Sequence, residues 1–120
     1  MSKKTPNPTD NEDRYRRIWD VVAGIPGGCV LNYGEVARRA GLPGRARLVG
    51  RALGLAPKSM RLPWHRVVNA QGQISFKPDR ARYRRQRELL EGEGVEFVDG
   101  VIDLEAHAPS QALDRMLWAP

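Results

Sequence analysis

The first clear pattern of apolar positions lies near the start of the chain. Apolar residues recur at positions 15, 18, 19 and 22, the spacing that places side chains on one face of an α-helix. Thr9 and Glu12 stand three residues apart just before this run, as in a capping box, and Gly24 follows it. The pattern predicts an amphipathic helix that ends near Gly24. The polar segment 1–10 is expected to be a disordered tail.

The next segment predicts a short extended piece followed by a helix. Residues 29–31 (Cys-Val-Leu) form an apolar run that we expect to be extended and buried, with Cys29 as a small core residue. Asn32 precedes Glu35 by three residues, which is typical of a helix N-cap. We therefore expect a helix over about 33–40.

A second helix is predicted directly after a tight turn. The sequence Gly-Leu-Pro-Gly at 41–44 should end the first helix, and a second is expected over about 45–55. Apolar positions 46, 49 and 53 of this helix share one face, whereas Arg47 and Arg51 point away from it. Two short helices joined by a glycine-containing turn, with arginines on the open face of the second, indicate a helix-turn-helix.

The second half of the chain predicts one more long helix and a hairpin. Residues 56–78 are expected to be irregular, and Asp79 is expected to cap a helix that runs to about Glu91. Residues 95–104 form two short apolar runs around Asp99-Gly100, the signature of a hairpin with a type I′ turn. A short helix is expected from about Ser110.

These elements together predict the fold class. We expect a mainly α fold with a small β-hairpin, arranged as a winged-helix-like helix-turn-helix DNA-binding domain. At 120 residues the chain is long enough for one modest core, and we assign residues 11–120 to a single domain.

Composition narrows the function classes. The single cysteine excludes an internal disulfide, and two scattered histidines make a structural metal site unexpected. The sequence has no apolar run long enough to span a membrane and no apolar leader segment at its start. We expect a cytoplasmic monomer that needs no cofactor or metal.

Charge is distributed unevenly along the chain. The formal net charge is +6, but residues 34–87 hold fourteen lysines and arginines against two acidic residues, a local balance of +12. Residues 88–120 hold eight acidic residues against one arginine, a balance of −7. Such an uneven distribution of charge fits either a polyanion-binding surface or an ordinary solvated surface. The arginines on the open face of the predicted second helix favour binding to a polyanion.

Several short motifs resemble one known family. They are Ile25-Pro26-Gly27-Gly28, Tyr33-Gly34-Glu35-Val36-Ala37, Gly41-Leu42-Pro43, Ala46-Arg47-Leu48-Val49-Gly50, Pro63-Trp64-His65-Arg66-Val67-Val68, Gly72, and Leu89-Leu90 followed by Glu93-Gly94. In order and spacing they resemble the DNA-binding domain of O6-alkylguanine-DNA alkyltransferases, over about residues 18–95. In that family a cysteine stands where this chain has Trp64. The tryptophan, together with residues 69–75 and 116–120, resembles the non-catalytic branch called alkyltransferase-like proteins.

The resemblance implies a pocket for a flipped base. Trp64 would form a wall of that pocket, and Tyr33 would press on the DNA backbone, with core packing as the competing role for Tyr33. A loop cation would sit against the alkylated purine. This cation corresponds to Lys77, or to Arg80 if the longer loop shifts the role.

The resemblance also implies roles outside the pocket. Arg47 matches an arginine that fills the gap left by a flipped nucleotide. DNA-backbone contacts are expected from Arg45, Arg51 and Arg38. In the active enzymes a histidine and a glutamate accept the proton of the reactive thiol; His65 and Glu93 match them and are expected to be structural. The active enzymes also usually have asparagine where this chain has Ala56.

The sequence thus yields one main hypothesis and two alternatives. The main one is a non-enzymatic sensor that docks its helix-turn-helix in the minor groove of double-stranded DNA and flips out O6-alkylguanine without alkyl transfer. It would flag the lesion for nucleotide excision repair proteins and be nucleoid-associated when bound to DNA. The first alternative is an enzyme, an alkyltransferase using Cys29 or a hydrolase using His65. The second is a winged-helix regulator that binds undamaged DNA.

Overall fold

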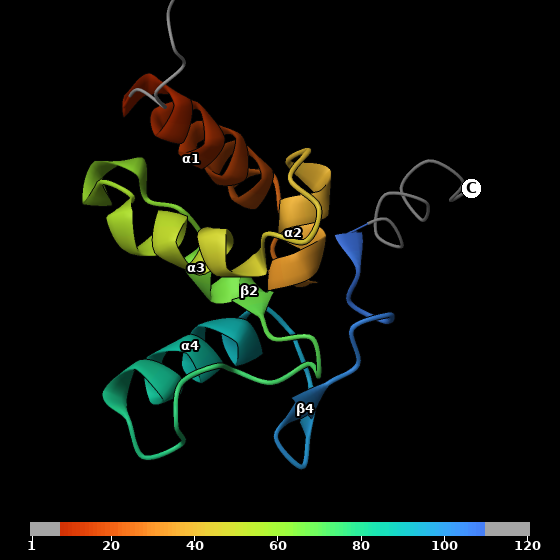
Figure 1. Cartoon of the computed structure of the whole chain (residues 1–120). Coiled ribbons are helices and arrows are strands. Elements are labelled where there is room, and N and C mark those ends of the chain that lie inside the picture. Colours follow the sequence, from red (N-terminus) through yellow and green to blue (C-terminus); the bar gives the residue numbers. More distant parts are fainter. Residues whose placement is uncertain (1–7, 110–120) are drawn as a thin grey trace, which may run out of the picture.

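The computed structural model describes residues 8–109 and has two halves (Figure 1). One half holds helices α1 (Pro8–Ala23), α2 (Tyr33–Arg39) and α3 (Ala46–Leu55), and the other holds α4 (Ala81–Gly92) and the hairpin β3 (Phe97–Val98) and β4 (Val101–Ile102). Strands β1 (Leu31–Asn32) and β2 (Val67–Val68) and two 3₁₀ turns, η1 (Lys58–Met60) and η2 (Trp64–Arg66), connect them. The predicted mainly α, winged-helix-like fold is confirmed.

Helix α1 packs across the helix-turn-helix. Ile18 and Val22 are fully buried, and the indole Nε1 of Trp19 donates to the carbonyl oxygen of Ala52 on α3 at 2.7 Å. The helix begins at Pro8, so the prediction that the segment 1–10 is a tail is wrong for residues 8–10. The capping-box pattern placed the start of the helix later than the backbone does. None of the helices within residues 8–109 has the length and apolar character to cross a bilayer.

The helix-turn-helix forms as its sequence predicts. The side chain of Asn32 accepts a hydrogen bond from the Glu35 amide at 2.8 Å and so caps α2. Gly41, at a positive φ of 78°, lies in the turn, and α3 then buries Val49 and Ala52 against α1 and α2. The opposite face of α3 stays open to solvent.

The prediction that residues 56–78 are irregular is wrong in part, because this segment contains η1, η2 and β2. Strand β2 pairs in parallel with β1, and Leu31 lies opposite Val67. Side chains alternate along a strand, so Leu31 and Val67 join the core of the helical half. Val30 and Val68 join a second core beneath α4 and the hairpin. The strand pair therefore has one face in each core.

Helix α4 and the hairpin build the second half. Asp79 does not cap α4: the N-cap residue is Arg80, and no side chain supplies a capping hydrogen bond there. The hairpin is confirmed, since Phe97 pairs with Ile102 and both turn residues, Asp99 and Gly100, have positive φ values of 52° and 77°. The helix expected from Ser110 lies outside the described residues.

The loop that follows β2 is anchored to the hairpin at a glycine. Gly72 has φ of +78°, and its carbonyl oxygen accepts from the amide of Ile102 at 2.8 Å. A Cβ on Gly72 would collide with the carbonyl oxygen of Ile102, so only glycine fits. This anchor sets where the loop turns back toward α4.

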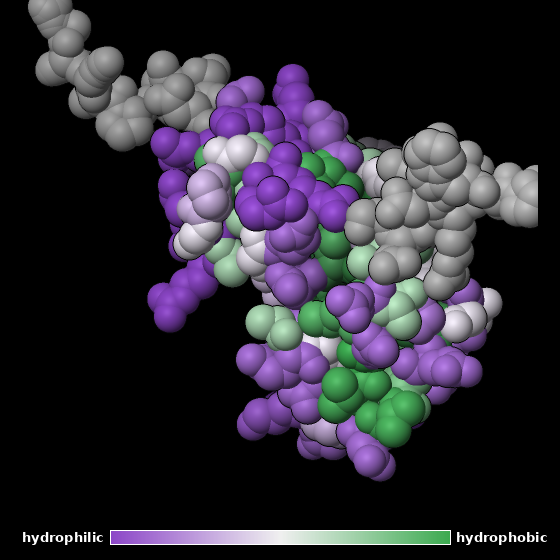
Figure 2. All heavy atoms as spheres, turned by 90° about the vertical axis from the view of Figure 1, so that its right-hand side faces the viewer, coloured by the Kyte–Doolittle hydropathy of each residue, from purple (hydrophilic) through white to green (hydrophobic). Residues whose placement is uncertain are grey.

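The face that carries the hairpin is distinct from the open face of α3. Figure 2 shows it as largely hydrophilic, with an apolar patch in its lower half, where the second core lies. Val98 and Val101 of the hairpin are exposed.

Candidate functional site

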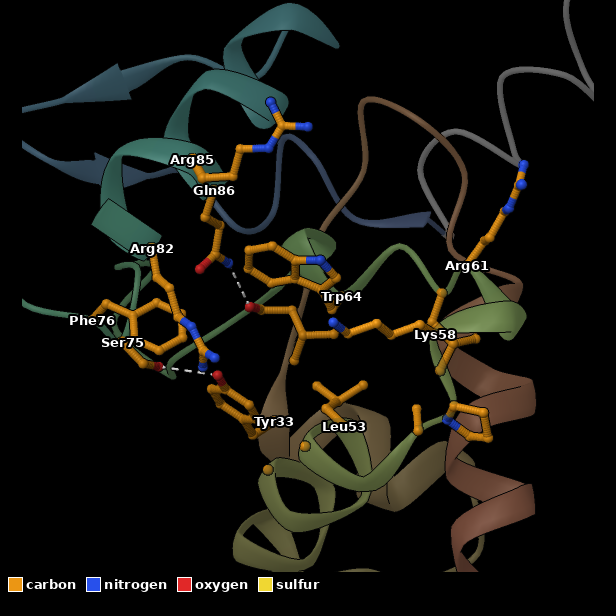
Figure 3. A pocket seen from close by; sticks show the side chains of 16 residues that line it. Tyr33, Leu53, Lys58, Arg61, Trp64, Ser75, Phe76, Arg82, Arg85 and Gln86 are labelled. Carbon is orange, nitrogen blue, oxygen red and sulfur yellow. Dashed lines mark hydrogen bonds between the residues drawn. The ribbon is translucent and has the colours of Figure 1, made fainter. Parts of the chain in front are cut away.

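A cavity of about 720 Å³ opens between α3, the segment that leads to β2, and α4 (Figure 3). Its walls are mostly apolar and aromatic, with Leu53, Leu62, Trp64 and Phe76 among them. Pockets of this size and character hold small organic groups, and an aromatic wall suits a planar ring. The cavity is therefore the candidate binding site.

Two sharp turns bring Trp64 into the cavity wall. Arg61 adopts a left-handed conformation, with φ 50° and ψ 44°. Pro63 follows with φ −78° and ψ 63°, and the Trp64 amide donates to the carbonyl oxygen of Leu62 at 2.8 Å. These values describe an inverse γ-turn. The indole of Trp64 meets the ring of His65 edge to face, with centroids 6.1 Å apart.

Behind Trp64, four side chains form what we call the bracing network: His65, Arg66, Gln86 and Glu93. His65 Nε2 lies 2.9 Å from Glu93 Oε2. Arg66 donates to both oxygens of the same carboxylate, at 3.0 Å from Nε and 2.6 Å from Nη2, and its Nη1 donates to the carbonyl oxygen of Ile25 at 2.7 Å. The predicted His65–Glu93 pair is therefore present, and Arg66 shares it.

The electrostatics of this network keep the carboxylate ionised. The hydrogen bond from the Arg66 guanidinium, followed by that with His65, lowers the pKa of Glu93 from 4.5 to about 2, against the opposing effect of burial. The backbone amide of Gly28 also donates to Glu93, at 3.4 Å. A carboxylate so firmly ionised and bonded is suited to holding its neighbours in place.

Gln86 completes the network and was not anticipated from the sequence. It is almost fully buried, and its Nε2 donates to the carbonyl oxygens of both His65 and Val67 at 3.0 Å. The only signal was an uncharged amide in an arginine-rich helix, which does not reveal a partner. Gln86 ties α4 to the segment that carries Trp64.

Tyr33 lies between the core of the helical half and the cavity. Its ring packs against the core of the helical half and also lines the cavity. The hydroxyl of Ser75 donates to the Tyr33 oxygen at 3.2 Å, which links the start of α2 to the loop after Gly72.

The structure does not bring the predicted pocket cations to the cavity. Lys77 and Arg80 are exposed and do not line it. Four other cations do, namely Lys58, Arg61, Arg82 and Arg85. The loop turns back at Pro78, so that Ser75 and Phe76 face the cavity and Lys77 does not. The guanidinium of Arg82 stacks over the Phe76 ring, 5.7 Å from its centroid.

The predicted DNA-contacting arginines divide into two groups. Arg45, Arg47 and Arg51 are exposed and border a shallow depression at the start of α3. Arg47 shares a helix face with Gly50 and Gly54, which line the cavity, so this face leads from the arginines to the pocket. By contrast, Arg38 on α2 is ion-paired.

Arg38 is held by a carboxylate on its own helix. Its Nε and Nη2 donate to Glu35 at 2.9 Å and 2.5 Å, and Arg39 donates to the same carboxylate at 2.8 Å. These contacts lower the pKa of Glu35 to about 2, and the hydrogen bond from Arg38 has the largest effect. Arg38 therefore has a counter-charge before any DNA arrives.

The two alternative catalytic residues are Cys29 and His65. Cys29 lies away from the cavity, and His65 is hydrogen-bonded to Glu93. Cys29 is buried in the core of the helical half and does not line the cavity. Within residues 8–109, no cluster of three histidine, cysteine or acidic side chains is arranged to hold a metal ion.

The fold and the site define a class of protein. A helix-turn-helix whose second helix is open and basic, beside a cavity with an aromatic wall, is typical of a DNA-binding domain with a pocket large enough for a base. The chain matches the model of the 6-O-methylguanine DNA methyltransferase DNA-binding domain over residues 13–95, and it belongs to that family.

Three relatives place the chain within this family. It is 46% identical to a DNA base-flipping protein of Escherichia coli (strain K12), over 82% of this chain and 76% of that protein. It is 44% identical to Alkyltransferase-like protein 1 of Schizosaccharomyces pombe, over 72% of this chain and 80% of that protein. The crystal structure of S. pombe Atl1 with damaged DNA containing O6-carboxymethylguanine matches with a TM-score of 0.70 and 38% identity, over 81% of this chain and 94% of that one. These matches confirm the resemblance to the alkyltransferase-like branch.

Proposed function

We propose that this protein is a non-enzymatic sensor of O6-alkylguanine in double-stranded DNA. Helix α3 enters the minor groove, Arg47 fills the gap left by a flipped nucleotide, and the damaged base enters the cavity against Trp64. The observation that carries the proposal is Trp64 itself, which lines a cavity large enough for a base, next to a hydrogen-bonded His65–Glu93 pair. The complex with damaged DNA of the S. pombe relative supports it.

The chemistry of the site argues against alkyl transfer. Transfer to protein needs a thiolate, and the indole of Trp64 supplies none. Cys29 is buried in a core away from the cavity. His65 is nearly buried and bonded to Glu93, which also holds Arg66, so the pair has a structural task here. A base held in the cavity would keep its alkyl group.

The energetics of capture are favourable for an aromatic cavity. Extruding a nucleotide costs a few kcal/mol, less when the base is damaged. Contact between a base and an aromatic ring contributes roughly 1–3 kcal/mol, and Arg47 can offset part of the lost stacking. Contacts between α3 arginines and phosphates would supply affinity that falls as salt rises.

A binding experiment with a chemical readout tests the proposal. Duplexes that differ only in guanine or O6-methylguanine are compared by gel shift, and the protein mass and DNA bases are then analysed. We expect tighter binding to O6-methylguanine, with protein and lesion both unchanged. Equal affinity for the two duplexes would instead favour a regulator of undamaged DNA. A methyl group on the protein, or recovered guanine, would establish an enzyme.

We further propose that the bound protein acts as a cytoplasmic, nucleoid-associated monomer that marks the lesion for nucleotide excision repair. A lesion-bearing duplex is incubated with a purified excision nuclease, with and without the protein. Faster incision at O6-methylguanine in its presence is expected. Unchanged or slower incision would reject this step while leaving lesion binding intact.

A further inference from the structure

The charged groups that line the cavity all have the same sign. Lys58, Arg61, Arg82 and Arg85 are cations, and no carboxylate is among the described lining residues. The bracing network directly behind is different, because Glu93 neutralises Arg66 there. A neutral alkyl group on a base needs only apolar contact, so it does not by itself require four cations in the cavity wall.

Arg82 is the cation best placed to meet a group inside the cavity. Figure 3 shows it extending from α4 past Phe76 toward Tyr33, whereas Arg85 points away from Tyr33. Its guanidinium stacks over the Phe76 ring, which limits the orientations it adopts. Within residues 8–109 no acidic side chain pairs with Arg82.

Lys58 reaches toward the cavity from the opposite wall. It belongs to η1, and Figure 3 shows its side chain extending beneath Trp64. No ion pair within the described part of the chain involves Lys58. A base seated against Trp64 would thus have one cation on the α4 side and one on the η1 side.

From this arrangement we propose that Arg82, with Lys58 opposite, forms an anion subsite within the lesion pocket. The subsite favours O6 substituents that carry a carboxylate over neutral substituents of the same size. A guanidinium presents paired N–H donors that match the two oxygens of a carboxylate, and removal from water strengthens such a contact. This inference rests on the proposed function, and it names the class of lesion.

A backbone phosphate could supply the same anionic chemistry. A phosphate is present in every duplex, whereas a substituent carboxylate is present in one kind of lesion. The two sources are therefore separated by changing the charge of the substituent and nothing else.

The test uses three duplexes identical except at one base. That base is guanine, O6-carboxymethylguanine, or its neutral amide isostere, O6-carbamoylmethylguanine. Dissociation constants are measured by fluorescence anisotropy at one fixed salt concentration. We expect the protein to bind the carboxylate lesion about 10-fold more tightly than the amide, as a charge-assisted hydrogen bond would give.

Variants assign the preference to its residues. Arg82→Gln is expected to abolish the preference for the carboxylate and Lys58→Gln to reduce it. Arg84→Gln is the matched control: it removes the same charge from α4, but Arg84 is exposed and does not line the cavity. That control should keep the full preference. Arg82 is itself exposed, so its replacement should leave the melting temperature unchanged.

The outcomes separate this inference from the proposed function. If both lesions bind equally and more tightly than guanine, the protein is a lesion sensor and the anion subsite is wrong. If Arg82→Gln weakens both lesions by the same factor, Arg82 binds phosphate and the inference is again overturned. If neither lesion binds more tightly than guanine, the proposed function itself fails.

Discussion

The two sides of Trp64 use charged residues in opposite ways. On the buried side, His65 and Arg66 share the carboxylate of Glu93, and Gln86 bonds two backbone carbonyls. On the cavity side, Lys58 and Arg82 have no acidic partner within the described residues. Charge that is satisfied inside the protein contributes to stability, whereas charge left unsatisfied is available to a ligand.

The difference suggests that stability and binding can be changed separately. His65 and Glu93 both belong to the bracing network. Replacing residues of the bracing network should change the free energy of unfolding. Replacing residues on the cavity side or on the open face of α3 should change DNA binding and leave unfolding almost unaltered.

The largest effect is expected for Glu93→Gln. The free energy of unfolding should fall by about 3 kcal/mol, because the half-buried Arg66 loses its counter-charge. Urea titrations at neutral pH measure this. Glu91→Gln is the control, since Glu91 makes an exposed pair with Arg87 and its loss should cost less than about 0.5 kcal/mol.

The same carboxylate should make stability depend on acid. The pKa of Glu93 is about 2 when folded and near 4.5 when unfolded, so its stabilisation is complete above pH 4.5 and is lost as pH falls toward 2. The pKa of Glu35 is also lowered to about 2, so the stabilisation from Glu35 is lost over the same pH range. Glu93→Gln should have a smaller loss of stability between pH 5 and pH 3 than the unmodified protein; equal losses would contradict the assigned role.

Arg47→Ala tests the other side of the comparison. Binding to an O6-methylguanine duplex should weaken by about 2 kcal/mol, since the part of the lost base stacking that Arg47 offsets is then uncompensated. The melting temperature should not change, because Arg47 is exposed. Arg16→Ala, which removes an equal charge from the exposed face of α1, is the control. Equal losses of affinity in the two variants would mean that Arg47 contributes only through its charge.

Gln86→Met should lower the free energy of unfolding by about 1.5 kcal/mol. The thioether fills a similar volume but leaves the carbonyl oxygens of His65 and Val67 without their donor. Thermal unfolding measures the loss. Gln73→Met serves as the control because the side chain of Gln73 is exposed. A neutral result for Gln86→Met would show that water replaces the amide.

The smallest effect is expected for Arg38. Arg38→Ala should leave the salt dependence of DNA binding almost unchanged, because Glu35 already neutralises this arginine. Arg51→Ala should reduce the slope of log affinity against log salt by about 1, the value for one phosphate contact. Affinities measured at several salt concentrations give both slopes. Equal changes in slope would mean that DNA displaces Glu35 from Arg38.

Local patterns account for the parts of the fold that were predicted. The Asn32 cap, the turn at 41–44 and the Asp99-Gly100 hairpin are each specified by neighbouring residues, and all appear as expected. Strand β2 was missed because two residues carry no periodicity and its partner β1 is distant in sequence. The start of α4 was misplaced because Asp79, although it precedes the helix, does not cap it with its side chain.

The candidate site was predicted only where a motif fixed it. Trp64, His65 and Glu93 follow from the resemblance, and the structure brings them together. Arg82 and Lys58 line the cavity and Lys77 does not, because the direction of a loop depends on tertiary packing that no local pattern shows. The role of Gln86 could not be predicted for the same reason, since its amide reaches the carbonyl oxygens of His65 and Val67 only when η2 lies against α4.

The small parallel pair β1–β2 has a consequence for how the molecule opens. Neighbouring residues of one strand serve different cores, so neither half can separate without exposing apolar surface of the other. The domain should therefore melt in a single cooperative step, with the amides of these strands among the slowest to exchange with deuterium. The proposed capture of a damaged base would gain from this rigidity, because Trp64 and helix α3 keep their spacing while the DNA deforms.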